Sequence, residues 1–217
     1  MRIKITIIYD NNAEKGLQAD WGFSCLLENE KTILFDTGAN GRILLGNMEK
    51  LGINPKSIDE VFISHSHFDH TGGLAEFLGI NEKVKIYIPS SFRGLKNRDI
   101  VEIKEPLKIH ADIFSTGELD GIEQSLVVNT EKGLAVITGC SHPGVDKIME
   151  RAKDIGRSIG QTKIYTVIGG YHGFNKFDRL KELAYIGACH CTQYKEKIQA
   201  LYPDKFKAIK AGTIIEI

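Results

Sequence analysis

The chain has 217 residues, in which 28 lysines and arginines balance 28 aspartates and glutamates. This length suits one domain, and a composition of 42% hydrophobic and 26% charged residues excludes general disorder. A net charge of zero, without a lysine- or arginine-rich tract, argues against nucleic acid as a partner. The N-terminus lacks a recognisable signal peptide and no apolar run reaches the roughly 18 residues of a membrane helix. We therefore expect no membrane contact.

The four cysteines indicate a reducing compartment. Four cysteines in a chain of this length do not form a disulfide framework, and Cys189 and Cys191 are too close for an ordinary bridge. The prediction is a cytoplasmic protein whose partner is a small-molecule substrate. Its oligomeric state stays open.

The first half of the chain alternates strands with helices. The expected elements are a strand at residues 2–9, a hairpin of strands 23–28 and 32–36, a helix at 40–51, a short buried strand at 60–64, a helix opening at 71–77 and a strand at 84–88. Gly72 and Gly73 allow that last helix to approach the sheet without a Cβ clash.

The second half begins with short strands and returns to alternation. The expected elements are strands at 100–104, 107–114, 124–130 and 133–138, a helix at 145–158, a strand at 163–168, a helix at 178–185, a strand at 185–188, a helix at 192–201 and closing strands near 206–209 and 213–217. Short strands mixed with peripheral helices predict one layered α/β domain over residues 1–217. This pattern argues against a helical bundle, an all-β barrel and a simple βαβ repeat.

The histidines are not scattered through this pattern. Only His110 lies inside a predicted strand, and six of the seven lie at or just past the carboxyl end of one: His65, His67, His70, His142, His172 and His190. Strand ends at one edge of a sheet converge, and loops there carry the chemistry of layered α/β domains. The placement predicts a functional site at this edge.

The run from His65 to His70 (HSHFDH) has a spacing that suits metal binding. Residues two apart in an extended segment point to the same side, so His65 and His67 can reach one cation. Asp69 and His70 fall at the turn into the following helix, from which they can face a second cation. Imidazole and carboxylate ligands suit Zn²⁺, with Fe and Mn as alternatives.

These motifs resemble the metallo-β-lactamase superfamily. The resemblance is carried by SHSHFDHTGG, by the upstream FDTG at residues 35–38 and by the later single histidines in the expected order, and it covers essentially the whole chain. It implies a four-layer αββα sandwich, in which two mixed β-sheets flanked by helices hold one or two metal ions at one edge.

The resemblance also implies a ligand set. A first metal falls to His65, His67 and His142, and a second to Asp69, His70 and His190. Asp36 matches the early aspartate of the family, which usually orients a ligand histidine. From local sequence alone, Asp36 is equally well a turn residue at the end of a strand.

One family feature is missing. A bridging aspartate usually ends a strand between the third and the last histidine, but the acidic residues in this interval all lie in or at the start of predicted helices: Asp146, Glu150, Asp154, Asp178 and Glu182. The strand at 163–168 is followed instead by Gly-Gly-Tyr-His, ending at His172. Either His172 takes over a ligand role or it contacts the substrate. A weaker, partly occupied second metal site is expected.

The residues beside these ligands admit two interpretations each. Cys140, Cys189 and Cys191 flank predicted ligands, so a soft-ligand or redox role competes with the favoured one of small buried residues at strand ends. Cys25 is expected in the core. Trp21 either lines the pocket or packs.

The leading functional hypothesis is a hydrolase. One or two Zn²⁺ ions would lower the pKa of bound water and supply hydroxide to a small ester, lactone, amide or phosphodiester. Asp69 would hold this water or accept its proton besides acting as a ligand. Asp69 and His172 are the predicted catalytic residues.

A second hypothesis keeps the site and changes the reaction. The motifs FDTGANG, GCSHPG, GGYHG and HCT are similar to a subgroup of metal-dependent hydrolases that includes dihydropterin-methyl-(ribofuranosyl)aminobenzene phosphate synthase-like proteins. This resemblance implies a transferase that condenses a dihydropterin pyrophosphate with a ribofuranosyl-aminobenzene phosphate, as in methanopterin precursor synthesis. A di-iron redox enzyme is disfavoured, because relatives of that kind carry glutamate where His67 stands and a fused flavin domain. A non-catalytic metal-binding module is also disfavoured, because open loops carry the ligands.

Overall fold

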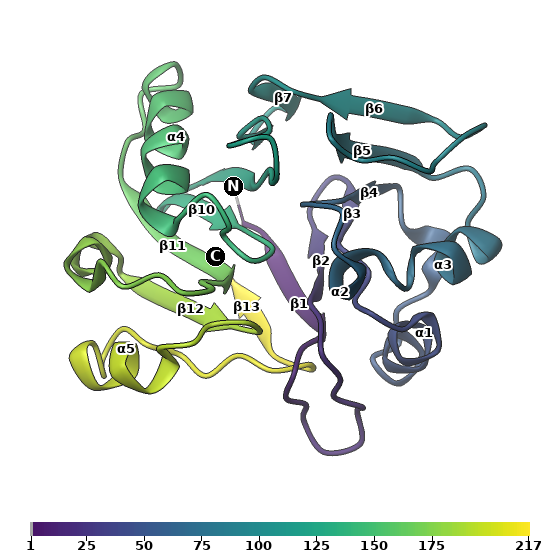
Figure 1. Ribbon diagram of the computed structural model, residues 1–217, viewed down its shortest axis with the longest axis horizontal. Helices are drawn as coiled ribbons and strands as arrows, with labels where there is room; N and C mark the ends of the chain where they lie inside the picture. The colour runs from purple at the N-terminus through teal and green to yellow at the C-terminus, as the bar shows by residue number, and fades with distance from the viewer. Residues whose placement is uncertain (1) are drawn as a thin grey trace. The chain divides into compact units, whose positions relative to one another are not determined.

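A computed structural model describes residues 2–217, and the chain divides there into two compact units, each built on a sheet of its own (Figure 1). The N-terminal unit comprises Arg2–Ile103 with Ile209–Ile217, and the C-terminal unit comprises Lys104–Ala208. Met1, the first residue of the predicted domain 1–217, lies outside the described residues. The prediction of a single domain stays a prediction.

The N-terminal unit is built on a seven-stranded mixed sheet with the order β13-β1-β2-β3-β4-β5-β6. Its strands are β1 (Lys4–Tyr9), β2 (Ser24–Glu28), β3 (Thr32–Phe35), β4 (Glu60–Phe62), β5 (Lys85–Pro89), β6 (Ile100–Ile103) and β13 (Ile214–Glu216). Pairing is antiparallel from β13 to β3 and parallel from β3 to β6. Because β3 and β4 run parallel, the segments that follow them emerge at the same edge of the sheet.

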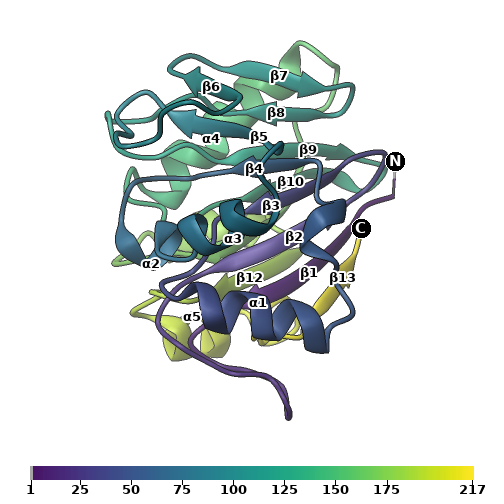
Figure 2. The same cartoon turned by 90° about the vertical axis from the view of Figure 1, so that its right-hand side faces the viewer.

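Helices cover one face of this sheet (Figure 2). They are α1 (Gly41–Lys50), α2 (Phe68–Thr71) and α3 (Leu74–Ile80), with a short 3₁₀ helix η1 (Pro55–Ser57). Asn40 caps α1 by accepting hydrogen bonds from the backbone N–H groups of Arg42 and Ile43. The buried Asn47 ties α1 to β1, because its amide donates to the carbonyls of Ile8 and Gln18. The predicted helix at 40–51 therefore has a structural role beyond its apolar face.

The C-terminal unit is built on a six-stranded mixed sheet with the order β12-β11-β10-β9-β8-β7. Its strands are β7 (Leu107–His110), β8 (Ile113–Ser115), β9 (Leu126–Thr130), β10 (Gly133–Ile137), β11 (Ile164–Gly170) and β12 (Tyr185–Cys189). Pairing is antiparallel from β7 to β10 and parallel from β10 to β12. The loops after β10, β11 and β12 therefore share one edge of this sheet.

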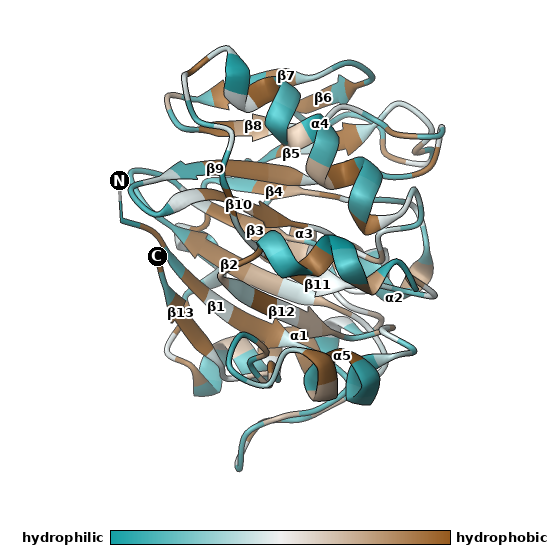
Figure 3. Ribbon diagram, turned by 90° about the vertical axis from the view of Figure 1, so that its left-hand side faces the viewer, coloured by the Kyte–Doolittle hydropathy of each residue, from teal (hydrophilic) through white to brown (hydrophobic). Residues whose placement is uncertain are grey.

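The helices of the C-terminal unit are α4 (Val145–Arg157) and α5 (Lys195–Leu201), with the 3₁₀ helix η2 (Phe177–Glu182). Ile148, Met149 and Ala152 of α4 belong to the same buried cluster as Val136 and Val167 of the sheet, whose strands are largely hydrophobic in Figure 3. No helix within residues 2–217 combines the length and the apolar character needed to cross a membrane.

The predicted fold class, with two mixed β-sheets flanked by helices, is confirmed. Several elements differ from their predictions. The predicted strand 107–114 is a hairpin of β7 and β8, because the chain turns at Ala111 and Asp112. His110 is therefore the last residue of β7 and does not lie in the middle of a strand, contrary to the prediction.

The C-terminal unit contains two further corrections. The predicted helix 178–185 is the 3₁₀ helix η2 and ends at Glu182; Leu180 and Leu183, both buried, are three residues apart, the spacing that a 3₁₀ turn places on one side. The predicted strand 206–209 is a single bridge between Ile186 and Phe206. The predicted helix 192–201 begins later, at Lys195.

Gly72 and Gly73 pack at very short range against the segment that follows β3. A Cβ atom added to Gly72 would lie 2.2 Å from the carbonyl oxygen of Ala39, and one added to Gly73 would lie 2.4 Å from that of Thr37. The expected close approach is thus present, against the segment that follows β3. It sets the position of α2 and α3 relative to the sheet.

We expect Gly73→Ala to lower the free energy of unfolding by about 1–3 kcal/mol, because the added methyl group must displace backbone. Gly79→Ala is the matched control: Gly79 lies in α3 with open space around it. Alanine there should stabilise the helix by up to about 1 kcal/mol. Urea denaturation of both variants measures the difference. Equal effects would contradict the proposed tight contact.

Candidate metal-binding site

Four predicted ligands gather in the N-terminal unit just past the carboxyl end of β4. The ring centroid of His65 lies 4.6 Å from that of His67 and 4.2 Å from that of His70. Nε2 of His70 lies 3.7 Å from Oδ2 of Asp69. Three imidazoles and one carboxylate form a donor set that suits Zn²⁺, Fe or Mn. The residues of the HSHFDH run thus fit a divalent metal ion.

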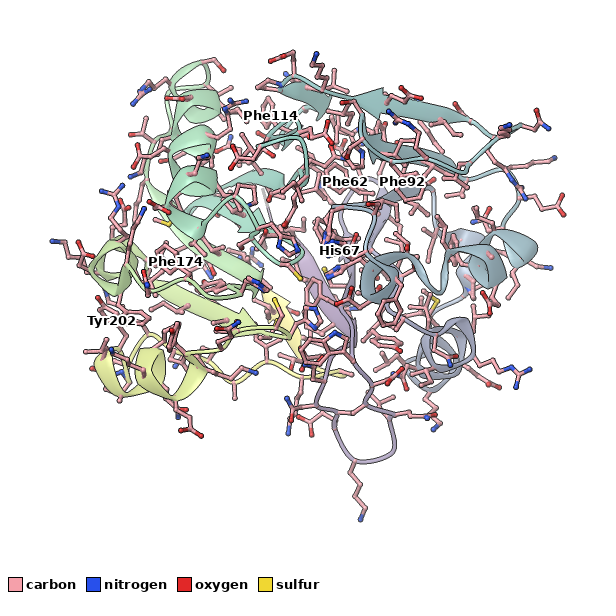
Figure 4. The ribbon with its side chains drawn as sticks, in the orientation of Figure 1. Phe62, His67, Phe92, Phe114, Phe174 and Tyr202 are labelled. Carbon is pink, nitrogen blue, oxygen red and sulfur yellow. The ribbon has the colours of Figure 1, made fainter. Side chains whose placement is uncertain are left out.

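The backbone of this run explains how sequence neighbours converge. His67, labelled in Figure 4, is extended, with φ −66° and ψ 147°, and precedes α2. The helical turn begins at Phe68, three residues before the predicted start, and the N–H of His70 donates to the carbonyl of His67 at 3.1 Å. This early turn brings His70 back toward His65.

Asp36 fixes two of these residues from the end of β3. Its Oδ2 lies 2.7 Å from Nδ1 of His70, and its Oδ1 accepts a hydrogen bond from the backbone N–H of Ser64 at 2.7 Å. The hydroxyl of Ser64 donates to Oδ2 of Asp36 and lies 2.9 Å from Nδ1 of His65. A carboxylate at Nδ1 favours a proton there, which leaves Nε2 of His70 as the metal-binding nitrogen. The predicted histidine-orienting contact of Asp36 is therefore present.

Trp21 joins the same group of residues. Its side chain is 52% exposed, and its Nε1–H donates to Oδ2 of Asp69 at 3.0 Å. The backbone N–H of Phe23 donates to the carbonyl of Asp69 at 3.2 Å. Trp21 is therefore not a core-packing residue; it lies beside the candidate site and restrains Asp69. Phe68, next in sequence to Asp69, is 67% exposed.

The C-terminal unit carries the other histidines on three loops that are hydrogen-bonded to one another. The hydroxyl of Ser141 donates to the carbonyl of Gly170 at 2.7 Å, and the N–H of Tyr171 donates to Oγ1 of Thr192 at 3.0 Å. The ring centroids of His142 and His172 are 5.0 Å apart. Within this unit, the structure thus joins the loops of His142, His172 and His190.

The missing bridging aspartate has a steric explanation. A Cβ atom at Gly169 would lie 2.0 Å from the carbonyl oxygen of Thr138, and one at Gly170 would lie 2.6 Å from Sγ of Cys191. Neither position has room for a carboxylate. The acidic residues of this interval instead lie on α4 and η2, where Asp146, Glu150, Asp154 and Glu182 form ion pairs with lysine or arginine. His172 is the first exposed residue after β11.

Glu123 is a site-related residue that the sequence did not reveal. It is buried, and its Oε1 accepts hydrogen bonds from the backbone N–H groups of residues 139, 140 and 141 at 3.0–3.1 Å. Its Oε2 accepts from the backbone N–H of His142 at 2.8 Å. The carboxylate therefore holds the loop that carries a predicted ligand. The sequence shows only a loop with glycine and serine after a strand. This pattern does not reveal which side chain accepts the hydrogen bonds of its backbone N–H groups.

All four cysteines are thiols, and Cys25, Cys140 and Cys189 are buried, as the favoured interpretation expected. Cys191 differs because it is only partly buried. Hydrogen bonding to Cys140, together with the charge of His190 and hydrogen bonding to His172, lowers the pKa of Cys191 to about 5, although burial opposes this shift. The Cys191 thiol, next in sequence to the predicted ligand His190, is thus unusually acidic.

Strained backbone marks the same strand ends. Asp36, Ser141, His172 and His190 have φ between 42° and 57°, which non-glycine residues rarely adopt. They follow β3, β10, β11 and β12 respectively. Such strain persists where surrounding contacts enforce it and is frequent at functional sites. It supports a functional role for these loops.

Comparison with known proteins identifies a family. The model of the metallo-beta-lactamase superfamily matches residues 22–149. The chain is 31% identical to the 7,8-dihydropterin-6-methyl-4-(beta-D-ribofuranosyl)-aminobenzene-5'-phosphate synthase of Methanocaldococcus jannaschii, covering 90% of this chain and 89% of that protein. An uncharacterised protein of the same organism is 29% identical, covering 98% of this chain and all of that one.

Solved structures match as well. The crystal structure of Tm1679, described as a metal-dependent hydrolase of the beta-lactamase superfamily, has a TM-score of 0.78 and 26% identity, covering 99% of both chains. A diphosphatase from the PhnP family has a TM-score of 0.65 at 14% identity, covering 100% of this chain and 98% of that one. The second likeness concerns the fold alone.

We expect Asp36→Asn to weaken zinc binding about 10- to 100-fold, because an amide has one acceptor oxygen and cannot accept from both the backbone N–H of Ser64 and the ring N–H of His70. Asp59→Asn is the control, since Asp59 lies at the opposite end of β4 and pairs with Lys31. Zinc titration followed by the fluorescence of Trp21, the single tryptophan, measures the affinity. Equal zinc affinity in the two variants would contradict the role of Asp36.

Proposed function

Because this chain belongs to the metallo-β-lactamase superfamily, we propose that it is a metal-dependent hydrolase acting on a small ester, lactone, amide or phosphodiester. One observation carries the proposal: three imidazoles and the carboxylate of Asp69 meet past the end of β4, with one imidazole held by a buried aspartate. Metal-dependent hydrolases use a divalent metal ion, and this donor set suits one.

Six residues are the proposed metal ligands. They are His65, His67, Asp69 and His70 in the N-terminal unit, and His142 and His190 in the C-terminal unit. We propose one or two Zn²⁺ ions, with Fe and Mn as alternatives, since imidazole-rich sites with a carboxylate suit these metals. When bound, such an ion lowers the pKa of water toward neutrality and polarises the group under attack.

Asp69 is proposed to hold the attacking water or to accept its proton. Its side chain is nearly buried, and its Oδ2 already accepts a hydrogen bond from Trp21 and faces Nε2 of His70. These contacts hold the carboxylate in one orientation, which a general base requires. Trp21 thus contributes to catalysis by restraining Asp69.

His172 is proposed as a substrate contact. Its ring is exposed, while its backbone is held at φ 42° and its carbonyl accepts a hydrogen bond from the N–H of Gln193 at 3.0 Å. An exposed imidazole on a fixed backbone suits hydrogen bonding to a substrate oxygen. A direct ligand role for His172 stays the alternative.

The thiol state of the cysteines agrees with the proposed cytoplasmic location.

We expect Asp69→Ala to lower turnover about 10²- to 10⁴-fold, because a positioned proton acceptor is lost. The free energy of unfolding should fall by only about 1 kcal/mol, the value of an ordinary hydrogen bond. Asp59→Ala, at the other end of β4, should keep its turnover. Removing the metal with a chelator should abolish the activity of every variant. Turnover that survives both Asp69→Ala and chelation would contradict metal-dependent hydrolysis.

Group transfer is the second candidate function, and a specific observation favours it. The relative that shares 31% identity over nine-tenths of this chain is, by its name, a synthase that joins a dihydropterin to a ribofuranosyl-aminobenzene phosphate. The same residues would serve both reactions, because a metal can activate either water or a leaving pyrophosphate. The two reactions differ in the nucleophile.

Incubation with a dihydropterin pyrophosphate, with and without a ribofuranosyl-aminobenzene phosphate, separates these functions. A hydrolase should release pyrophosphate at the same rate in both mixtures, or leave this compound intact while it cleaves esters. A transferase should form the condensed product only when the acceptor is present. Mass spectrometry identifies the products, and each transfer releases one pyrophosphate. Condensed product in a 1:1 ratio with the pyrophosphate released, together with no release when the acceptor is omitted, would overturn the hydrolase proposal.

A further inference from the structure

The carboxylate of Glu123 occupies the inside of a backbone turn in the C-terminal unit. Four successive N–H groups, from Gly139 to His142, point at this one side chain, and the hydroxyl of Thr138 adds a fifth donor at 2.9 Å. Successive backbone N–H groups that converge in this way form an anion-binding concavity. Here the anion is supplied by the chain itself.

The two carboxylate oxygens have different tasks. Oε1 accepts from Thr138 and from residues 139–141, so it maintains the shape of the turn. Oε2 accepts from the N–H of His142, the residue whose side chain is proposed to hold metal. One bond out of the five therefore acts on the position of the histidine itself.

A buried charge is expensive, which makes this arrangement informative. Glu123 is 1% exposed, and a carboxylate at such depth costs several kcal/mol unless hydrogen bonds compensate. A neutral apolar residue would fill the same space at a lower cost, but it would leave the N–H groups of this turn without their acceptor. The strained Ser141, with φ 57°, shows that the turn is held away from its relaxed shape.

We propose that Glu123 is a positioning residue for His142, and that its Oε2 sets the place of this histidine for metal binding. This inference rests on the proposed function, since it takes His142 as a metal ligand. Asp36 offers a contrast, because it contacts the imidazole of His70 directly. Glu123 acts on the backbone of His142 only, so its loss should displace the ligand without changing the preferred tautomer.

Glu123→Gln isolates this bond. The amide oxygen of glutamine should take the Oε1 position, where four donors meet, and the amide NH₂ should then face the N–H of His142. Thr138→Val is the matched control, because it removes one donor to Oε1 and leaves the bond to His142 in place. Both variants should lose stability, but only Glu123→Gln should lose zinc affinity.

The measurement is zinc affinity by competition with a chromophoric chelator, with unfolding by urea recorded in parallel. We expect Glu123→Gln to bind zinc about 10-fold more weakly, because loss of a hydrogen bond that positions a metal ligand commonly lowers metal affinity by this amount. Thr138→Val should bind zinc like the unaltered protein. In a His142→Ala background, Glu123→Gln should cause no further loss, since the two changes act through one ligand. Unchanged affinity in Glu123→Gln, or an additive loss in the double variant, would overturn the inference.

Further measurements distinguish failure of this inference from failure of the proposed function. An unaltered protein that binds none of Zn²⁺, Fe²⁺ and Mn²⁺ contradicts the proposed function; hydrogen exchange of the His142 amide then tests the positioning contact directly. Protection that is lost in Glu123→Gln and kept in Thr138→Val supports the contact, and equal protection overturns it. If Glu123→Gln does not fold, Glu123→Asp withdraws the carboxylate by one methylene and should give the same selective loss of zinc affinity.

Discussion

The hydrogen bonds of the buried Asp36 are the interaction on which the candidate site depends. A carboxylate without solvent must be compensated, and here the compensation comes from Ser64 and His70 on the neighbouring segment. The parallel pairing of β3 and β4 places both segments at one edge of the sheet. The same contacts that satisfy Asp36 therefore fix the rings of His65 and His70. Stability of the sheet edge and geometry of the ligands are consequences of one network.

The C-terminal unit also compensates a buried carboxylate with hydrogen bonds, but from different partners. Glu123, in the segment before β9, is also a buried carboxylate, but its partners are backbone N–H groups and a hydroxyl. Both arrangements hold a loop in strained backbone, with positive φ at Asp36 and at Ser141. Strain of this kind costs about 1–3 kcal/mol for each residue and requires strong local contacts. A buried carboxylate supplies them in each unit.

The sequence predicts the parts of this site whose spacing is local. His65 to His70 follow one another within a single run, so a two-residue period and one helical turn suffice to bring them together. The bond between Trp21 and Asp69 joins residues 48 positions apart, and those of Glu123 reach backbone groups 16 to 19 positions away. Backbone N–H groups carry no side-chain signature, so no motif could reveal Glu123. The hairpin at His110 was missed for a related reason, because its turn contains neither glycine nor proline.

Family membership fixes the fold and shows that the chain is an enzyme, while the choice between hydrolysis and transfer depends on the residues of its site. Under the proposed function, hydrolysis and transfer would use the same histidines and the same carboxylate, so the HSHFDH run does not distinguish them. The two reactions differ in whether water or a second substrate reaches the reacting atom, and this depends on the surface around Asp69. Trp21 and Phe68 adjoin that residue and are largely exposed. Such aromatic side chains can exclude water or hold a planar acceptor, so we expect the choice between the two reactions to depend on residues that are not metal ligands, Trp21 and Phe68 among them.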